Sequence, residues 1–470
     1  MMSTPSATVV GDYDLHQPRT QTFFDARQGF LDGTSTPRDY LEECLSTIEK
    51  LEPVVQAWVC LNTDNARRAA DEATERYRQG NPLSPIDGMP VGIKDMLQTH
   101  DMPTTLGSPI FAGRNTGMDS ASVNALRLAG AVIAGKTVTT EFALMVPGPT
   151  TNPYSKDATP GGSSSGSSAA VGAGMVPVAL GNQVVGSVIR PASYCANYAI
   201  KPTMGALHGG EGASWSQLHV GVHAGSLEDM WAVAYEIGQR AGGDPGYPGL
   251  YGPQALAPAK KPESLIVIET EGWSQCDDTT LATFDALLRQ LSDQGVRLMS
   301  RKDNQAIDRF EKSIDNSVPL SRILCSYEIR WALRAYKRTG LMSEQLGVWL
   351  SMAEELGPDD YREALQKRDA MRADFAALQP LADGLITMSA PGPAPGIGFV
   401  TGGEDAYGFV TGDPAFNAAT SSLGCPAITV PLMSIGSMPV GAQFIGHLHR
   451  DWQLCGHARW AMDTLEPVIR

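Results

Sequence analysis

A lysine and several serines stand in segments where they could carry out nucleophilic chemistry. Lys94 follows the apolar run 90–93, which is typical of a buried strand. A free lysine titrates at about pH 10.4, but burial among apolar residues favours the neutral amine. A neutral amine can act as the base that activates a serine hydroxyl. Taken alone, Lys94 is better explained as a surface lysine paired with Asp95, so the serines decide between these interpretations.

The stretch 160–168, PGGSSSGSS, has three interpretations. A flexible Gly/Ser linker is one, although this stretch runs directly into apolar sequence rather than joining two domains. A nucleophile elbow is the second, because residues 162–166 match G-x-S-x-G with Ser164 at the centre. Such an elbow follows a strand, and residues 150–160 do not read as one. The third interpretation takes the stretch together with Lys94 and Ser187.

Taken together, these segments resemble the amidase signature family, whose members use a Ser–cis-Ser–Lys triad. The resemblance runs from about residue 88 to 237 and again from 414 to 464. The second block includes SLGCPAITVP at 422–431 and PVGAQFIG at 439–446. Several separate motifs in the family's order make this resemblance more specific than any one of them.

The resemblance implies a role for each matching residue. Ser187 would be the nucleophile, Ser163 the cis-serine that relays a proton, and Lys94 the base. The expected oxyanion hole consists of backbone N–H groups of Val184, Val185, Gly186 and Ser187. The expected substrate-binding residues are Met145, Gly161, Gly162 and Arg190.

The chain departs from the family pattern just before Ser187. Val184 and Val185 stand where the family usually has Thr-Gly, and Gln183 replaces a frequent aspartate. We interpret these changes as an altered pocket shape, although a branched side chain at 185 puts the efficiency of the hole in question. Arg190 would either bind a substrate carboxylate, as in malonamidase-like relatives, or form a structural ion pair.

The predicted activity is cleavage of an amide C–N bond through an acyl-enzyme on Ser187. The apolar segment around Met145 favours a small apolar or aryl amide, and relatives that act as aryl acylamidases or urethanases extend this to carbamates. One alternative is an amidotransferase A-type subunit that works with partner proteins. Another is a metal-dependent amidohydrolase that would use the pairs His219/His223 or His447/His449; no HExxH occurs. We expect no cofactor and no metal.

The elements that must position these residues alternate between helix and strand, which predicts an α/β fold. Helical periodicity and capping boxes predict helices at 36–51, 64–78, 122–129, 226–237 and 280–293. Short apolar runs predict strands at 90–93, 131–135, 176–180, 263–269 and 296–299. With the resemblance, this implies the amidase signature fold, with a large mixed central β-sheet flanked by α-helices on both faces.

The whole chain, 1–470, is expected to form a single amidase domain. The region of about 300–410 carries little resemblance, and residues 302–380 within it read as mostly helical. The long Gly/Pro-rich segment 389–415 is a candidate lid because of its length.

Composition narrows the class of partners. The formal net charge of -15 disfavours nucleic acid, and the longest apolar run, 169–180, is shorter than the roughly 20 residues of a membrane span. Seven cysteines without a CxxC pair, and no basic region followed by an apolar run at the start, predict a reduced, cytoplasmic protein. We expect the protein to bind a small-molecule amide or carbamate and to have no contact with a membrane. The sequence leaves open whether the chain forms a homodimer.

Overall fold

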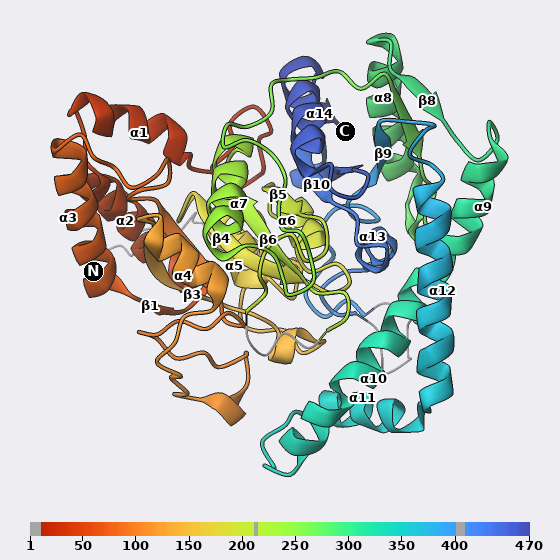
Figure 1. The fold of residues 1–470 in the computed structure, drawn as a ribbon, viewed down its shortest axis with the longest axis horizontal. Coiled ribbons are helices and arrows are strands. Elements are labelled where there is room, and N and C mark those ends of the chain that lie inside the picture. The colour runs from red at the N-terminus through yellow and green to blue at the C-terminus, as the bar shows by residue number, and fades with distance from the viewer. Residues whose placement is uncertain (1–10, 211–214, 401–408) are drawn as a thin grey trace, which may run out of the picture.

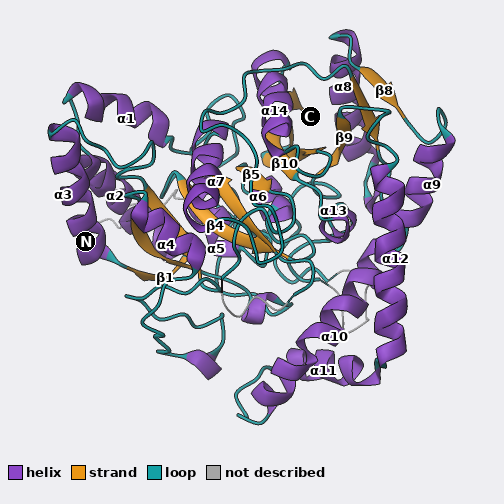
Figure 2. Ribbon diagram, in the orientation of Figure 1, coloured by secondary structure: helices purple, strands orange, loops and turns teal. Residues whose placement is uncertain are grey.

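Helices cover a mixed β-sheet that runs through the molecule (Figures 1 and 2). The computed structural model describes residues 11–210, 215–400 and 409–470. In these residues the sheet has twelve strands in the order β1-β3-β2-β4-β6-β5-β10-β11-β9-β7-β8, and β12 pairs with β10. The pair β2–β4 is parallel and the pair β10–β11 is antiparallel, so the sheet is mixed, as the sequence predicts.

The bounds of the elements follow in chain order. The strands are β1 (Trp58–Leu61), β2 (Pro90–Lys94), β3 (Val132–Thr137), β4 (Val178–Gln183), β5 (Tyr198–Lys201), β6 (His219–Ala224), β7 (Ser264–Val267), β8 (Arg297–Met299), β9 (Gly384–Met388), β10 (Ala427–Ile435), β11 (Met438–Ile445) and β12 (Val468–Ile469). The α-helices are α1 (Phe23–Asp32), α2 (Pro37–Val55), α3 (Thr63–Arg78), α4 (Ala121–Leu128), α5 (Ser165–Gly172), α6 (Ile189–Tyr194), α7 (Leu227–Ala241), α8 (Asp278–Asp293), α9 (Gln305–Ile314), α10 (Ser317–Lys337), α11 (Glu344–Glu355), α12 (Pro358–Ala376), α13 (Ala418–Leu423) and α14 (Asp451–Thr464). Short 3₁₀ turns lie at η1 (Pro109–Phe111), η2 (Glu141–Ala143) and η3 (Glu271–Gln275).

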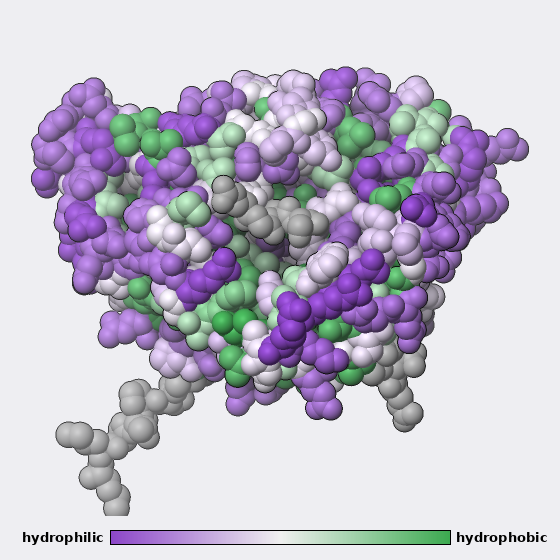
Figure 3. Space-filling model, turned by 60° about the horizontal axis from the view of Figure 1, so that its bottom comes forward, coloured by the Kyte–Doolittle hydropathy of each residue, from purple (hydrophilic) through white to green (hydrophobic). Residues whose placement is uncertain are grey.

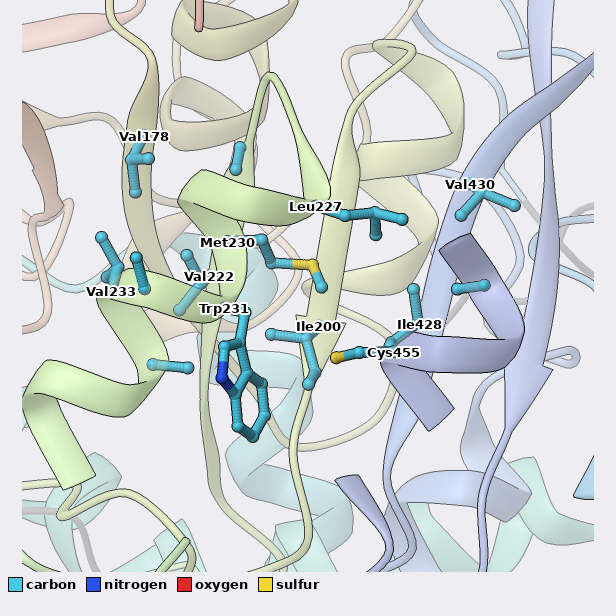
Figure 4. Packing of buried hydrophobic residues seen from close by; sticks show 14 of the residues in the cluster. Val178, Ile200, Val222, Leu227, Met230, Trp231, Val233, Ile428, Val430 and Cys455 are labelled. Carbon is cyan, nitrogen blue, oxygen red and sulfur yellow. The ribbon is translucent and has the colours of Figure 1, made fainter. Parts of the chain in front are cut away.

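Alternating residues of the central strands pack into separate cores on the two faces of the sheet. Val178 and Leu180 of β4 join the cluster that contains Trp231 of α7, whereas Ala179 joins the cluster that contains Val171 of α5. Figure 4 shows the first core, in which side chains of α7 meet those of neighbouring strands. Because successive side chains of a strand point to opposite faces, this pattern requires cover on both sides of the sheet.

The predicted capping boxes begin two of the helices. Thr36 accepts a hydrogen bond from the N–H of Asp39 at the start of α2, and Ser226 accepts one from the N–H of Asp229 at the start of α7. The remaining predicted helices and strands of the first three hundred residues are also present, with ends shifted by a few residues. β4 continues beyond the predicted 176–180 to Gln183 because its last residues pair with β6.

The region 302–380 is helical, as predicted, and comprises α9 to α12. Helices α10 and α11 form an arm at the lower right of Figure 1. Of the candidate lid 389–415, residues 401–408 lie outside the described residues. No helix in the described part of the chain has the length and apolar character that crossing a bilayer requires.

A fully buried carboxylate joins the first helix to the central part of the fold. Asp229 of α7 accepts hydrogen bonds from the N–H groups of Phe23 and Phe24, at 2.8 and 3.1 Å. These are the first two N–H groups of α1, which have no acceptor within that helix. Asp229 therefore caps a helix that lies about two hundred residues away in the sequence.

Replacing this carboxylate should destabilise the protein. We expect Asp229→Ala to lower the free energy of unfolding by about 2–3 kcal/mol, because two buried donors lose their acceptor. Urea denaturation monitored by tryptophan fluorescence measures the change. Glu228→Ala is the matched control: its partner Arg459 lies 3.5 Å away and both side chains are more than one third exposed, so the expected loss stays below about 1 kcal/mol. Equal losses for the two variants would contradict the role given to Asp229.

Candidate active site

Three chain segments deliver polar groups to one edge of the sheet. β2 ends at Lys94 and its parallel neighbour β4 ends at Gln183, with Ile93 opposite Leu180. Parallel neighbours place their carboxyl ends at the same edge of a sheet. Helix α5 starts there as well, directly after Ser164. The stretch 160–168 is buried throughout and ends in this helix, so the linker interpretation is wrong.

The amine of Lys94 is buried among uncharged polar groups. Its Nζ lies 2.8 Å from Ser163 Oγ, 2.9 Å from Ser164 Oγ and 2.6 Å from Asn182 Oδ1, and the residue has no exposed surface. Burial lowers the pKa of this amine well below its usual range. Asp95, the alternative partner, instead accepts from the N–H of Thr105 and faces Lys136 at 3.5 Å.

The hydrogen bonds around Lys94 suit a neutral amine, which has two N–H donors and one lone pair. Asn182 Oδ1 can only accept, and Ser164 accepts from Nζ while it donates to the carbonyl oxygen of Asn182 at 3.3 Å. The carbonyl oxygen of Asn182 lies farther from Nζ, at 3.3 Å, so the two closer acceptors take the two N–H groups of a neutral amine. The lone pair is then left for the hydroxyl of Ser163. Sequence reasoning missed the contacts of Ser164 and Asn182 with the lysine, because they depend on the pairing of β2 with β4.

Ser163 and Ser187 line the same cavity, but they differ in backbone geometry and in exposure. The peptide bond between Gly162 and Ser163 is cis, and Ser163 is 4% exposed. Ser187 is half-buried in the turn between β4 and α6, and its hydroxyl makes no hydrogen bond to the described residues. Lys94 is thus hydrogen-bonded to Ser163, and Ser187 lies in the wall of the cavity that Ser163 also lines. Ser164, the centre of the G-x-S-x-G match, is fully buried and lies behind that wall.

The turn that carries Ser187 lines the cavity, and its backbone N–H groups lack acceptors among the described residues. The carbonyl of Val184 accepts from Gln217 Nε2 at 3.0 Å, that of Val185 from Ser421 Oγ at 2.8 Å, and that of Gly186 from the N–H of Arg190 at 3.3 Å. In a trans peptide the N–H points opposite to the C=O. The N–H groups of the residues that follow, 185 to 187, therefore face away from these donors. None of these three N–H groups has a protein acceptor in the described part of the chain.

Valine at position 185 fits this turn without special backbone geometry. Neither Val184 nor Val185 has a positive φ, and both side chains are half-buried at the cavity wall. Gly186 is constrained by space instead, since a Cβ there would lie 2.6 Å from Arg190 Nη1 and 2.8 Å from Asn417 Oδ1. The altered residues thus change the wall of the cavity and leave the turn intact.

The cavity has a volume of about 320 Å³ and largely apolar walls. Its apolar lining includes Phe142, Leu144, Met145, Ile329, Tyr336 and Trp349. Helices α10 and α11 supply the last three, so the helical region 302–380 forms much of the wall. The charged residues in its described lining are Arg114, Arg190 and Arg322, and none is acidic. Figure 3 shows hydrophobic side chains gathered between hydrophilic ones on the face of the molecule that carries the arm.

Two of the predicted substrate-binding residues line this cavity and two do not. Met145 and Arg190 are in the wall, whereas Gly161 and Gly162 are absent from its described lining. A Cβ at Gly161 would lie 2.6 Å from Pro191 Cα, so this glycine permits close packing behind the wall. Gly162 contributes its carbonyl, which accepts a hydrogen bond from Arg190.

Arg190 is buried and forms no ion pair with the described residues. Nε and Nη2 donate to the carbonyl and hydroxyl of Thr411, and Nη2 also donates to the carbonyl of Gly162 at 2.7 Å. Nη1 is buried and has no hydrogen-bond partner among the described residues. Burial lowers the pKa of this guanidinium below its usual value. A guanidinium in this position can donate hydrogen bonds to an anionic or carbonyl group in the cavity.

The histidine pairs noted in the sequence serve other contacts. His219 Nδ1 contacts the carbonyl of Gln183 at 3.3 Å, and His447 Nε2 contacts that of Ala382 at 2.8 Å. Burial lowers the pKa of the His223 imidazole to about 3. Across residues 11–210, 215–400 and 409–470, no three His, Cys, Asp or Glu side chains are grouped as metal ligands.

Known proteins resemble this chain over most of its length. A family model described as Amidase matches residues 39–455. The glutamyl-tRNA(Gln) amidotransferase A subunit of Synechococcus sp. (strain WH7803) is 30% identical over 473 residues, covering 90% of this chain and 92% of that protein. The corresponding protein of Chloroflexus aggregans is 37% identical over 215 residues, and this match spans only 42% of its length and 44% of this chain. A solved amidase structure has a TM-score of 0.80 at 25% identity, covering 95% of this chain and 100% of its own.

Proposed function

This chain belongs to the amidase family, and we propose that it is a serine hydrolase that cleaves the C–N bond of an amide through an acyl-enzyme on Ser187. One observation carries the proposal. The amine of Lys94 is buried without a described acidic partner, 2.8 Å from a serine hydroxyl that opens onto the cavity of Ser187. A base in this state is what a serine nucleophile needs.

In the first half-reaction, Ser187 replaces the amine of the substrate. Neutral Lys94 accepts the proton of Ser163 while Ser163 accepts that of Ser187, and Ser187 Oγ bonds to the carbonyl carbon. The hydroxyls of Ser163 and Ser187 form no hydrogen bond to each other in the described structure, and catalytic hydrogen bonds of this kind often shorten only when substrate binds. The negative charge on the carbonyl oxygen is stabilised by the N–H groups of residues 185–187, each worth about 2.7–4 kcal/mol.

The first half-reaction ends when the C–N bond breaks: the proton returns from Lys94 through Ser163 to the leaving nitrogen, which departs as an amine. In the second half-reaction, water releases the acyl group. Water then donates a proton to the same relay and attacks the acyl carbon. The carboxylic acid leaves, and Ser187 regains its proton.

The cavity supports a substrate with an apolar or aromatic part. The wall around Met145 and Tyr336 suits an aryl or alkyl group, and a carbamate presents the same carbonyl and C–N bond to Ser187. Arg190, with Nη1 unpartnered, would hold a carboxylate or another acceptor of the substrate. These features favour small aryl or alkyl amides, with carbamates as a related class.

A second candidate is the A-type component of an amidotransferase, favoured by the relative that is 30% identical over 90% of this chain. Such a component would use the same acyl-serine chemistry to release ammonia from glutamine for a partner protein. Free glutamine carries an ammonium as well as a carboxylate, and the described cavity lining contains no acidic side chain to meet it. Ammonia release from glutamine as fast as anilide cleavage would favour this second candidate.

The identity of the nucleophile can be tested by covalent labelling. We expect a fluorophosphonate to label Ser187, and Ser187→Ala to lose both labelling and the hydrolysis of 4-nitroacetanilide while the thermal unfolding midpoint stays unchanged. Ser164→Ala is the comparison: Ser187 should stay the labelled residue, at a lower rate, because Ser164 accepts a hydrogen bond from Lys94 Nζ but lies behind the cavity wall. Near-native turnover by Ser187→Ala would exclude this residue as the nucleophile.

The charge of the base can be tested through Asn182, whose Oδ1 lies 2.6 Å from Lys94 Nζ. Activity requires the neutral amine, so kcat/KM should fall at low pH as Lys94 becomes protonated. In Asn182→Asp a carboxylate stabilises the ammonium and raises the pKa of Lys94, which moves this acid limb to higher pH by about 1–3 pH units. The measurement is the pH dependence of kcat/KM.

Asn182→Leu separates the effect of charge from that of shape. It removes the acceptor without adding charge, so its acid limb should stay at the wild-type pH or move lower even if the rate falls. An unchanged acid limb in Asn182→Asp would mean that a group other than Lys94 titrates.

The role of Arg190 can be tested with two matched anilides, one whose acyl chain ends in a carboxylate and one whose chain ends in its methyl ester. We expect Arg190→Met to lower kcat/KM for the carboxylate about 10- to 100-fold more than for the ester, because one charge-assisted hydrogen bond is lost. Arg190→Lys should recover part of the difference. An equal loss for both substrates would assign Arg190 to structure alone.

A further inference from the structure

We propose that Gln217 is a positioning residue for the reaction: it holds the carbonyl of Val184 so that the N–H of Val185 points at the carbonyl oxygen of the substrate. Ser421 does the same for the next peptide, by holding the carbonyl of Val185. This inference rests on the proposed function, because it assumes that an oxyanion forms beside Ser187.

Gln217 reaches the turn from a separate part of the chain. It lies just before β6, is fully buried, and donates from Nε2 to the carbonyl of Val184 at 3.0 Å. The same Nε2 lies 3.3 Å from Ser321 Oγ on α10, and Oε1 accepts from Ser422 Oγ on α13 at 3.3 Å. The nitrogen end of the amide thus faces the carbonyl of Val184, and this is the shortest of its three contacts. Among the described residues Gln217 is the sole hydrogen-bond donor to this carbonyl.

Ser421 fixes the following peptide in the same way. Its hydroxyl donates to the carbonyl of Val185 at 2.8 Å and accepts from Gln183 Nε2 at 2.9 Å. Gln183 Oε1 in turn accepts from the N–H groups of Val188 and Ile189, at 2.8 and 3.0 Å. The amide of Gln183 therefore ties the two sides of the turn together.

These hydrogen bonds matter because a peptide plane can rotate between its two flanking Cα atoms. Rotation of the 184–185 peptide would turn its N–H out of the cavity and its carbonyl into it, where the carbonyl would repel an oxyanion. The hydrogen bond from Gln217 opposes this rotation, since the rotated carbonyl would leave a buried N–H of Gln217 without an acceptor. The side chain acts through the backbone and lies outside the described cavity lining.

The same network reaches the helix that forms the cavity wall. Ser321 Oγ contacts both Gln217 and Ser422, the latter at 3.2 Å, while Val318 and Cys325 on the same helix line the cavity. A substrate that packs against α10 therefore contacts the helix that is hydrogen-bonded to the side chain orienting the oxyanion donors. This places the positioning function partly in the helical region 302–380, which also forms the cavity wall.

Gln217→Met tests the proposal, because methionine keeps the length of the side chain and removes its donor. With 4-nitroacetanilide we expect kcat to fall about 10- to 100-fold while KM stays within about threefold, since the lost interaction acts on the transition state. The rate of fluorophosphonate labelling of Ser187 should fall in parallel, with the thermal unfolding midpoint within a few degrees of wild type. Ser422→Ala, which contacts Gln217 but neither valine carbonyl, is the matched control and should retain kcat within about threefold.

Three results would overturn the proposal. They are a kcat within threefold of wild type in Gln217→Met, an effect on KM alone, or an equal loss in Ser422→Ala. If Gln217→Met does not fold, Ser421→Ala is judged by the same measurements, since it removes the shorter of the two hydrogen bonds to the carbonyl of Val185 and leaves that from Gln183 Nε2 at 3.4 Å. Failure of wild-type protein to be labelled at Ser187 would instead refute the proposed function, so the two failures are distinguishable.

Discussion

The burial of one amine without a described acidic partner is the constraint on which the rest of the site depends. A charged lysine in an apolar interior is costly, and that cost falls away when the amine is neutral. The surrounding hydroxyl and amide groups satisfy the neutral form, because Asn182 and Ser164 accept both N–H groups and Ser163 meets the lone pair. A carboxylate in any of these positions would restore the charge and remove the base.

The sheet makes this burial possible. Lys94 sits at the end of β2, which has β3 and β4 on its two sides and is buried at every residue. Helix α5 covers the same end of the sheet and begins with the serines, so the amine and its acceptors are fixed by elements that are themselves buried on both faces. The packing of the surrounding core thus holds the amine and its acceptors at these hydrogen-bond distances.

The sequence predicts much of the fold, since capping boxes and apolar runs mark elements such as α2, α7 and β2 locally. It also predicts Lys94, Ser163 and Ser187 as site residues; the structure places the first two in hydrogen-bond contact and the two serines on the wall of one cavity. Asn182 and Gln217 could not be found in this way, because their partners lie 88 and 33 residues away and depend on strand pairing and loop packing. The wall formed by α10 was equally hidden, since a helix pattern does not reveal which face meets a cavity.

The two positions before Ser187 show how one turn can satisfy separate requirements. Glycine before a nucleophile is often needed for positive φ, but neither position 185 nor 186 has one in this chain. Position 185 tolerates valine because its side chain enters the cavity, where it adds to the apolar wall. Position 186 keeps glycine because Arg190 packs against its Cα, and that contact also places the unpartnered Nη1 beside the turn. The same two residues therefore set the shape of the wall and the location of the buried cation. A substitution at either position should change substrate preference more than it changes the fold.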